Sequence, residues 1–259
     1  MKKAALAAAC ALTLPALAHD TWVQPRAFRV APGGSLLLEF TSGMRFPQPD
    51  HAPEPERLVR ARVRLSGQEA DIPSRERGDH ALLLTAPVRM AGLATVWVAT
   101  KPATLTLKEA EVEEYLHEIG AAQTAGKAWR ERKPPKTWRE TYRKHAKTFV
   151  KVGAASDPSW AEPAGLELEI VPEADPFALR APASLRIVVL KRGKPLASFV
   201  VAAAAQGSER RLVTTDADGR AQVVLDRPGP WLLAGTEIRP KGDAWESDFT
   251  TLSLEVRPP

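Results

Sequence analysis

Cysteine is nearly missing from this sequence, which has only Cys10, inside the apolar N-terminal segment. Removal of that segment would leave no thiol, which excludes disulfide bonds, a cysteine nucleophile and a thiolate metal site. A transition metal bound by the remaining chain would therefore need nitrogen and oxygen ligands, a set that suits Cu(II), Ni(II) or Zn(II).

Long apolar runs are missing beyond residue 18. Residues 1–18 combine Lys2 and Lys3 with an apolar stretch and Ala16-Leu17-Ala18, the pattern of a secretory signal peptide cleaved after Ala18. The apolar stretch of about a dozen residues is too short for a membrane-spanning helix. We therefore predict a periplasmic product with no membrane span.

The motifs of common enzymes are missing as well. The sequence has no Gly-x-Ser-x-Gly elbow, no His-Glu-x-x-His pair, no phosphate-binding glycine loop and no dinucleotide fingerprint. Asp216-x-Asp218-Gly219 lacks the third oxygen ligand and the later glutamate of a calcium loop, so we interpret it as a hairpin turn. We expect that the protein is not an enzyme.

Positive charge is concentrated in Lys127–Lys151, in a chain with a formal net charge of +5. A basic segment with aromatic residues can bind nucleic acid or anionic lipid. In an exported protein we favour a solvated helix face, and we expect no nucleic-acid partner.

The fold class that the pattern predicts is mainly β, with two antiparallel sandwich domains. Residues 19–107 and 166–259 alternate short β-branched or leucine-rich runs with glycine and proline breaks, which is typical of sandwiches. The second half has seven such runs and fits a transthyretin-like or fibronectin-like module. Predicted strands are Phe28–Val30, Ser35–Thr41, Leu58–Leu65, Ala81–Leu84, Thr95–Ala99, Leu166–Val171, Ser184–Leu190, Ala197–Ala204, Arg211–Thr215, Ala221–Leu225, Trp231–Thr236 and Phe249–Val256.

Between these domains we predict a helical connector, residues 108–152, followed by a linker at 153–165. In Lys108–Thr124 the apolar residues recur at helical spacing. A second helix is predicted over Lys136–Val150, with Trp138, Tyr142, His145 and Phe149 on one face.

The most informative histidine is His19, because cleavage after Ala18 makes it the first residue. Its new α-amino group and its imidazole can bind one metal ion together, and a second histidine would complete a three-nitrogen site. His145 is the first candidate, because its helix face points toward the core; a core histidine bonded to a backbone carbonyl is the alternative. His51 is the second candidate, in a proline-rich loop with two carboxylates, where a plain surface histidine is the alternative.

Several segments together resemble one bacterial family. They are Ala18–Trp22, Trp138–Phe149, Leu168–Pro172, Gly193–Leu196, Thr215–Gly219 and Trp245–Phe249. The sequence is similar to an exported family known only as a domain of unknown function. Relatives of that family include the NikM-like or NikK-type periplasmic accessory proteins of nickel and cobalt uptake.

The resemblance covers essentially all of the chain after residue 18 and implies a periplasmic two-sandwich protein that handles transition metals. It also implies that Tyr142-x-x-His145-x-Lys147 is a signature motif, which places His145 ahead of His51 as the partner of His19. The loop has Asp50-His51-Ala52-Pro53 where nickel-type relatives tend to carry His-Pro. The ion therefore stays open among copper, nickel and cobalt.

Three hypotheses follow from the sequence. The first is a periplasmic metal-binding protein that serves a metal transporter or another envelope protein, with His19, His145 and His51 as ligands. The second is a non-catalytic envelope module that binds a partner or a glycan. The third is an oxidative copper enzyme, because the same ligands can activate oxygen.

Overall fold

The computed structural model describes residues 19–155 and 157–259, so the predicted signal peptide lies outside the described residues. The described chain is mainly β, with two α-helices and mostly antiparallel sheets, which confirms the predicted fold class. No helix in these two ranges is both long and apolar enough to cross a membrane.

The strands before the helices are β1 (Asp20–Pro25), β2 (Arg29–Val30), β3 (Ser35–Gly43), β4 (Leu58–Leu65), β5 (Gln68–Asp71), β6 (Ser74–Arg77), β7 (Leu82–Pro87), β8 (Gly92–Thr100) and β9 (Ala103–Leu107). The middle of the chain forms α1 (Glu109–Glu118), α2 (Ala125–Arg130) and β10 (Trp138–Val152). The remaining strands are β11 (Leu168–Pro172), β12 (Ala183–Lys191), β13 (Lys194–Pro195), β14 (Val200–Ala205), β15 (Arg211–Thr214), β16 (Arg220–Leu225), β17 (Gly229–Lys241) and β18 (Ala244–Val256). Short 3-10 helices cover Pro55–Arg57, Pro158–Ala161 and Pro176–Ala178.

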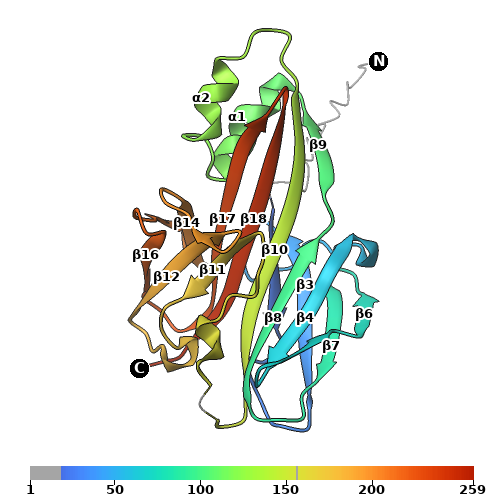
Figure 1. The fold of residues 1–259 in the computed structure, drawn as a ribbon, viewed down its shortest axis with the longest axis vertical. Helices are drawn as coiled ribbons and strands as arrows, with labels where there is room; N and C mark the ends of the chain where they lie inside the picture. Colours follow the sequence, from blue (N-terminus) through green and yellow to red (C-terminus); the bar gives the residue numbers. More distant parts are fainter. Residues whose placement is uncertain (1–18, 156) are drawn as a thin grey trace, which may run out of the picture.

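One central sheet runs through both halves of the molecule, in the order β15-β14-β17-β18-β10-β8-β4-β5, with β2 and β9 also paired to β10 (Figure 1). The two halves meet where β10 pairs in parallel with β18, so that His145 lies opposite Thr250. β10 also pairs in parallel with β2 and antiparallel with β8 and β9, and β17 pairs antiparallel with β18. A continuous sheet thus connects the two predicted sandwich regions directly.

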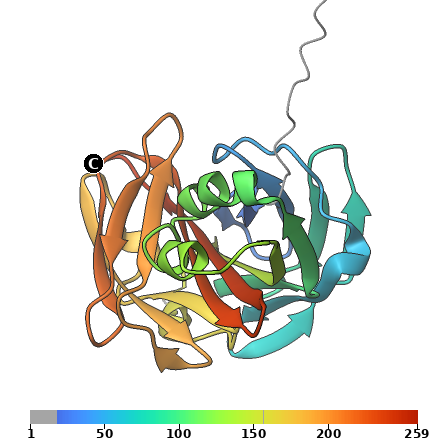
Figure 2. The ribbon, with the colours of Figure 1, turned by 90° about the horizontal axis from the view of Figure 1, so that it is seen from above.

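Smaller sheets pack on this central sheet and close two cores. The sheet β1-β3-β7-β6 contributes Leu38 and Phe40 to a core shared with Val96 and Val150. The sheet of β11, β12, β13 and β16 closes a second core over β14, β17 and β18. Figure 2 shows these two β regions side by side, with the helices in front of them.

The helices cover the long strands where these extend beyond the two sandwiches (Figure 1). Val112, Tyr115 and Leu116 of α1 pack with Trp129, Trp138 and Trp245 in a third core. The rings of Trp138 and Trp245 are stacked, with centroids 4.4 Å apart. The helix predicted within Lys108–Thr124 is therefore confirmed, and its apolar stripe covers the sheet.

The helix predicted over Lys136–Val150 is wrong, because this segment is the long strand β10. The residues with helical spacing lie on both faces of a strand that is buried on both sides. Trp138, Ala146 and Phe149 each belong to a different core. Strands buried on both faces show no apolar–polar alternation, so periodicity alone does not distinguish them from a helix.

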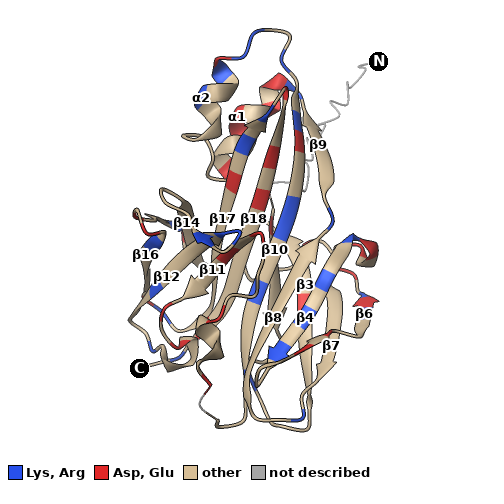
Figure 3. Ribbon diagram, viewed as in Figure 1, with Lys and Arg blue, Asp and Glu red and all other residues tan. Residues whose placement is uncertain are grey.

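The solvated basic face predicted for this segment is also wrong in its centre, where Lys144 and Lys147 are buried. Figure 3 shows charged residues along the middle of β10, within the body of the molecule. Lys147 is neutralised by Glu169, whose carboxylate lies 2.5 Å from its ammonium. Charge pairing makes the burial of Lys147 possible.

The Asp216–Gly219 turn forms, but it does not close a hairpin. Gly219 donates its N–H to the Asp216 carbonyl, at 3.1 Å, and the Asp216 carboxylate accepts from two further backbone N–H groups. The flanking strands β15 and β16 pair with different neighbours, β14 and β12. The turn thus carries the chain from one sheet of the sandwich to the other.

Candidate functional site

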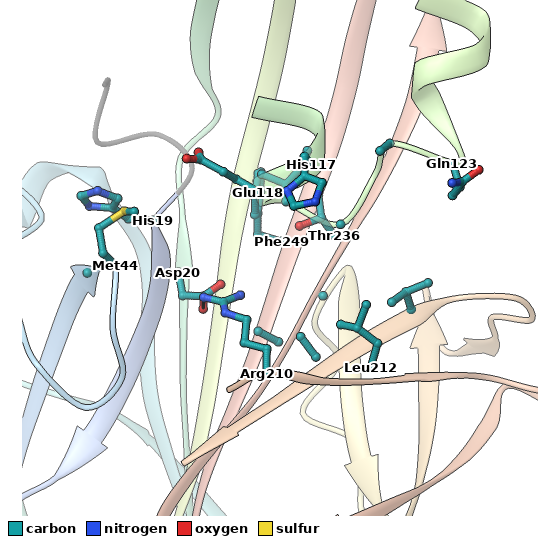
Figure 4. Close-up of a pocket in the computed structure, with 18 residues that line it drawn as sticks. His19, Asp20, Met44, His117, Glu118, Gln123, Arg210, Leu212, Thr236 and Phe249 are labelled. Carbon is teal, nitrogen blue, oxygen red and sulfur yellow. Dashed lines mark hydrogen bonds and ion pairs between the residues drawn. The ribbon is translucent and has the colours of Figure 1, made fainter. Parts of the chain in front are cut away.

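A cavity of about 540 Å³ lies on the helix-side face of the central sheet. Its walls come from the starts and ends of distant elements: His19 and Asp20 at β1, Gly43 and Met44 at the end of β3, and several residues between His117 and Gln123, at the end of α1 and just after it. Its floor includes small apolar side chains of β14 and β17. Figure 4 shows His19 beside Met44 at one end and Leu212 toward the other.

His19 is half-buried, and its Nδ1 atom is buried without a hydrogen-bond partner among the described residues. Burial is the main reason that the pKa of His19 lies below its ordinary value, and the nearby charge of Lys144 lowers it further. The imidazole is therefore kept neutral, the form in which histidine binds a metal.

The backbone at His19 is held by a buried lysine. Lys144 donates from Nζ to the His19 carbonyl at 3.0 Å and to Thr21 Oγ1 at 2.9 Å. Thr21 in turn shares a hydrogen bond of 2.7 Å with Ser42, and its carbonyl accepts from Thr251 at 2.7 Å. Burial lowers the pKa of Lys144 to about 8, although Asp20 acts in the opposite direction. The start of β1 is thus tied to both β3 and the central sheet.

Asp20 connects this region to the second half of the chain. Its carboxylate lies 2.5 Å from the guanidinium of Arg210, which follows β14. Both residues line the cavity (Figure 4). The ion pair joins β1 to the second sandwich region. It therefore restricts the start of β1, in addition to the hydrogen bonds from Lys144.

His51 is brought to the same edge as His19. It forms an isolated bridge with Ser42, which itself pairs with Thr21, so the three backbones lie in one row. The charge of His51 acts on the pKa of His19, and so does that of its neighbour Asp50. A side chain at Gly43 would meet the Gln48 carbonyl at 2.6 Å, so glycine lets this loop pack closely. The His51 side chain is exposed.

His145 lies on the opposite face of the sheet from His19, contrary to the expected pairing. Successive side chains of a strand point to opposite faces, and Lys144 is the residue that faces His19. His145 is 4% exposed and its Nε2 lies 3.3 Å from Asp248 Oδ1. It is a core histidine, as in the alternative interpretation, although its partner is a carboxylate and not a backbone carbonyl.

Asp248 is the centre of a charge cluster on that far face. Burial opposes its ionisation, but hydrogen bonds from His145 and Lys191 outweigh this effect and hold its pKa at about 2. The Lys191 ammonium lies 2.5 Å from Asp248 and 2.5 Å from Glu237. The cluster joins β10, β12, β17 and β18, and Asp248 is paired with both His145 and Lys191. Nδ1 of His145 has no hydrogen-bond partner among the described residues.

The sequence did not reveal several residues of the cavity wall. His117 lies there as an exposed residue at the end of α1, and no local pattern indicates that it shares a cavity with His19. Asp20, Met44 and Arg210 were missed, since only the fold brings them together. Across residues 19–155 and 157–259, no group of three or more His, Cys, Asp or Glu side chains is arranged to hold a metal ion. A His19 site would therefore depend on the α-amino group that cleavage creates.

The chain belongs to the family described as "Domain of unknown function (DUF4198)", whose model matches residues 16–236. No curated protein matches the sequence.

Solved structures that the chain resembles are distant and larger. Trypsin-activated alpha-2-macroglobulin from Escherichia coli aligns with 93% of this chain and 16% of its own length, at 10% identity and a TM-score of 0.26. The Yersinia pseudotuberculosis adhesin InvE aligns over 93% and 59%, at 11% identity and a TM-score of 0.25. A Ca²⁺-stabilised ice-binding adhesin of an Antarctic bacterium aligns over 93% and 49%, at 11% identity and a TM-score of 0.27. The chain spans less than two thirds of each of these proteins.

Proposed function

We propose that the processed chain is a periplasmic transition-metal-binding protein that acts in metal uptake or delivery. The ion is copper, nickel or cobalt, held by the α-amino group and Nδ1 of His19. The observation that carries this proposal is the buried Nδ1 of His19, which has no partner among the described residues and lies at the wall of a cavity. A buried polar atom without a hydrogen bond is costly unless a ligand satisfies it.

The donor chemistry of this end of the cavity fits such an ion. A neutral imidazole and an amine are nitrogen ligands that suit Cu(II), Ni(II) and Co(II). His51 supplies the third nitrogen in the proposal, because its backbone is connected to β1 through Ser42. His145 takes no part, since the sheet separates it from His19.

Delivery requires that the site be open to a partner, and the geometry of His51 supports this. His51 is exposed, and Met44 beside the same edge is 51% exposed. A metal transporter or another envelope protein can therefore approach the ion from the side of the β3–β4 loop. A site that is open to a partner suits exchange of an ion more than permanent storage of the ion.

The proposal is tested by titrating Cu(II), Ni(II) and Co(II) into the chain that begins at His19. We expect one ion per chain and a loss of tight binding in His19→Ala, with unchanged thermal unfolding of the metal-free protein. Equal affinity of the two proteins for all three ions would overturn the proposal. In that case a non-catalytic envelope module that binds a partner or glycan becomes the better account.

A further inference from the structure

The cavity beside His19 is far larger than a metal ion needs. A volume of about 540 Å³ lies within the usual range of small-molecule sites, whereas a single water occupies about 30 Å³ of liquid. His19 lies at one end, near Met44 (Figure 4). The remainder of the cavity is therefore left for something other than the ion.

The other end of the cavity is mostly apolar, although Gln123 lies at this end too (Figure 4). Its floor is made by Val200 and Ala202 of β14 and by Ala234 and Gly235 of β17. Leu212 lines it as well and is 64% exposed. Small side chains in a row leave a flat apolar surface, on which a planar organic group can lie and be removed from water.

The charges of the cavity favour a cation. Among the described lining residues, the formally charged side chains are the carboxylates of Asp20 and Glu118 and the guanidinium of Arg210. Arg210 is paired with Asp20, so Glu118 carries the unpaired formal charge among these lining residues, while the buried ammonium of Lys144 lies behind His19 at the metal end. A ligand that carries carboxylates would meet no unpaired guanidinium here, whereas a positively charged complex would be attracted.

We propose that this site takes its transition-metal ion as a cationic complex with a small, neutral, nitrogen-donating organic chelator that has an apolar face. The inference rests on the proposed function of His19. The amine, Nδ1 and His51 supply three donors, and the metals concerned accept further ligands from the chelator. The chelator's apolar face lies on Val200, Ala202 and Leu212, while the ion lies at the His19 end.

The test compares copper(II) alone, copper(II) with one equivalent of bipyridine, and bipyridine alone, each titrated into the chain that begins at His19. Two variants alter the apolar end: Ala202→Leu fills the floor, and Leu212→Ala removes an exposed contact. Ala204→Leu is the matched control, because Ala204 lies on the same face of β14 and is also half-buried, but does not line the cavity.

We expect the complex to bind about tenfold more tightly than copper(II) alone. Ala202→Leu should remove this difference and Leu212→Ala should reduce it, with the affinity for copper(II) alone unchanged in both. Ala204→Leu should behave as the unmodified chain.

Equal affinities for the complex and for copper(II) alone would overturn the inference and leave the metal site intact. Bipyridine alone binding as tightly as the complex would also overturn it, because the ion would then contribute nothing. If both Ala202→Leu and Leu212→Ala still bind the complex more tightly than copper(II) alone by the same factor, this end of the cavity is excluded as the site of the chelator. Failure of copper(II) to bind in any form would overturn the proposed function itself, and this inference with it.

Discussion

The ammonium of Lys144 donates a hydrogen bond of 3.0 Å to the backbone carbonyl of His19. This contact joins the middle of the longest strand to the first described residue. Because Lys144 faces His19, its neighbour His145 faces the other side of the sheet. The contact therefore both positions the candidate metal ligand and removes the partner that the sequence suggested for it.

Replacement of Lys144 by methionine should weaken metal binding at His19. Methionine keeps most of the side-chain length but cannot donate a hydrogen bond to the His19 carbonyl. Loss of a residue that orients a metal ligand typically lowers metal affinity about tenfold or more. Isothermal titration with copper(II) measures the change. Lys151→Met, on the same strand, is the control and should bind as the unmodified chain. Unchanged affinity in Lys144→Met would show that the contact does not position the site.

Replacement of His51 and of His145 by alanine should give opposite results. His51→Ala should lower copper affinity about tenfold or more, because it removes a proposed ligand. His145→Ala should leave the affinity unchanged and lower the free energy of unfolding, because it leaves Asp248 without one of its partners. Metal titration and chemical denaturation of both variants measure the two quantities. Loss of copper binding in His145→Ala alone would contradict the structural assignment.

Asp248→Asn should lose stability in a pH-dependent manner. Its pKa is about 2 in the folded protein against an ordinary value of 3.8, so ionised Asp248 stabilises the fold above about pH 4. This stabilisation, about 2 kcal/mol, is lost as the pH falls from about 4 to about 2. Urea unfolding of both proteins at pH 7 and at several values below 4 tests this. A stability difference that does not shrink toward pH 2 would contradict it.

Tyr115→Phe should loosen α1 from the sheet. The Tyr115 hydroxyl donates to the buried Glu140 carboxylate, with both oxygens at 2.9 Å. Burial raises the pKa of Glu140 and hydrogen bonds oppose this, so loss of one donor makes its ionisation more costly. We expect a loss of about 1–3 kcal/mol in unfolding free energy. Tyr142→Phe is the control, because Tyr142 is half-buried and lies on the same face of β10 as Glu140. Hydrogen exchange over Glu109–Glu118 measures the local stability of α1.

Much of the fold could be predicted from the sequence because its strands are short and bounded by turns. Leu58–Leu65 was predicted with the bounds that β4 has, and the seven strands of the second half are all present. The edge strands β5 and β6 were missed, since they are exposed and polar. Alternation of apolar and polar residues indicates a strand that is buried on one face. It does not indicate a strand that is exposed on both faces or buried on both.

The largest error, the helix over Lys136–Val150, has this cause. Phe149 and Val150 are buried in different cores, so apolar residues follow one another as they would on a wide helix face. His145 was assigned to the site through that helix, and the error in the element became an error in the site. Periodicity cannot resolve such a segment, whereas the β-branched residues Thr148, Val150 and Val152 favour a strand.

The candidate site was predictable only where its chemistry is local. The importance of His19 follows from its place after Ala18, and this remains a prediction that the described residues do not test. The pair of Asp20 and Arg210 joins residues 190 positions apart, and no local pattern in either segment indicates it. The cavity and its apolar floor arise from the meeting of β1, α1 and β14, so they appear only with the fold.

The most direct test of the metal site compares the chain that begins at His19 with one that carries a single extra alanine before it. The extra residue converts the α-amino group of His19 into an amide and leaves every side chain in place. We expect the processed chain to bind one copper(II) tightly and the extended chain to lose about a hundredfold or more in affinity, since a ligand is removed outright. Equal affinity of the two chains would contradict the account, because the amino group of His19 would then have no part in the site.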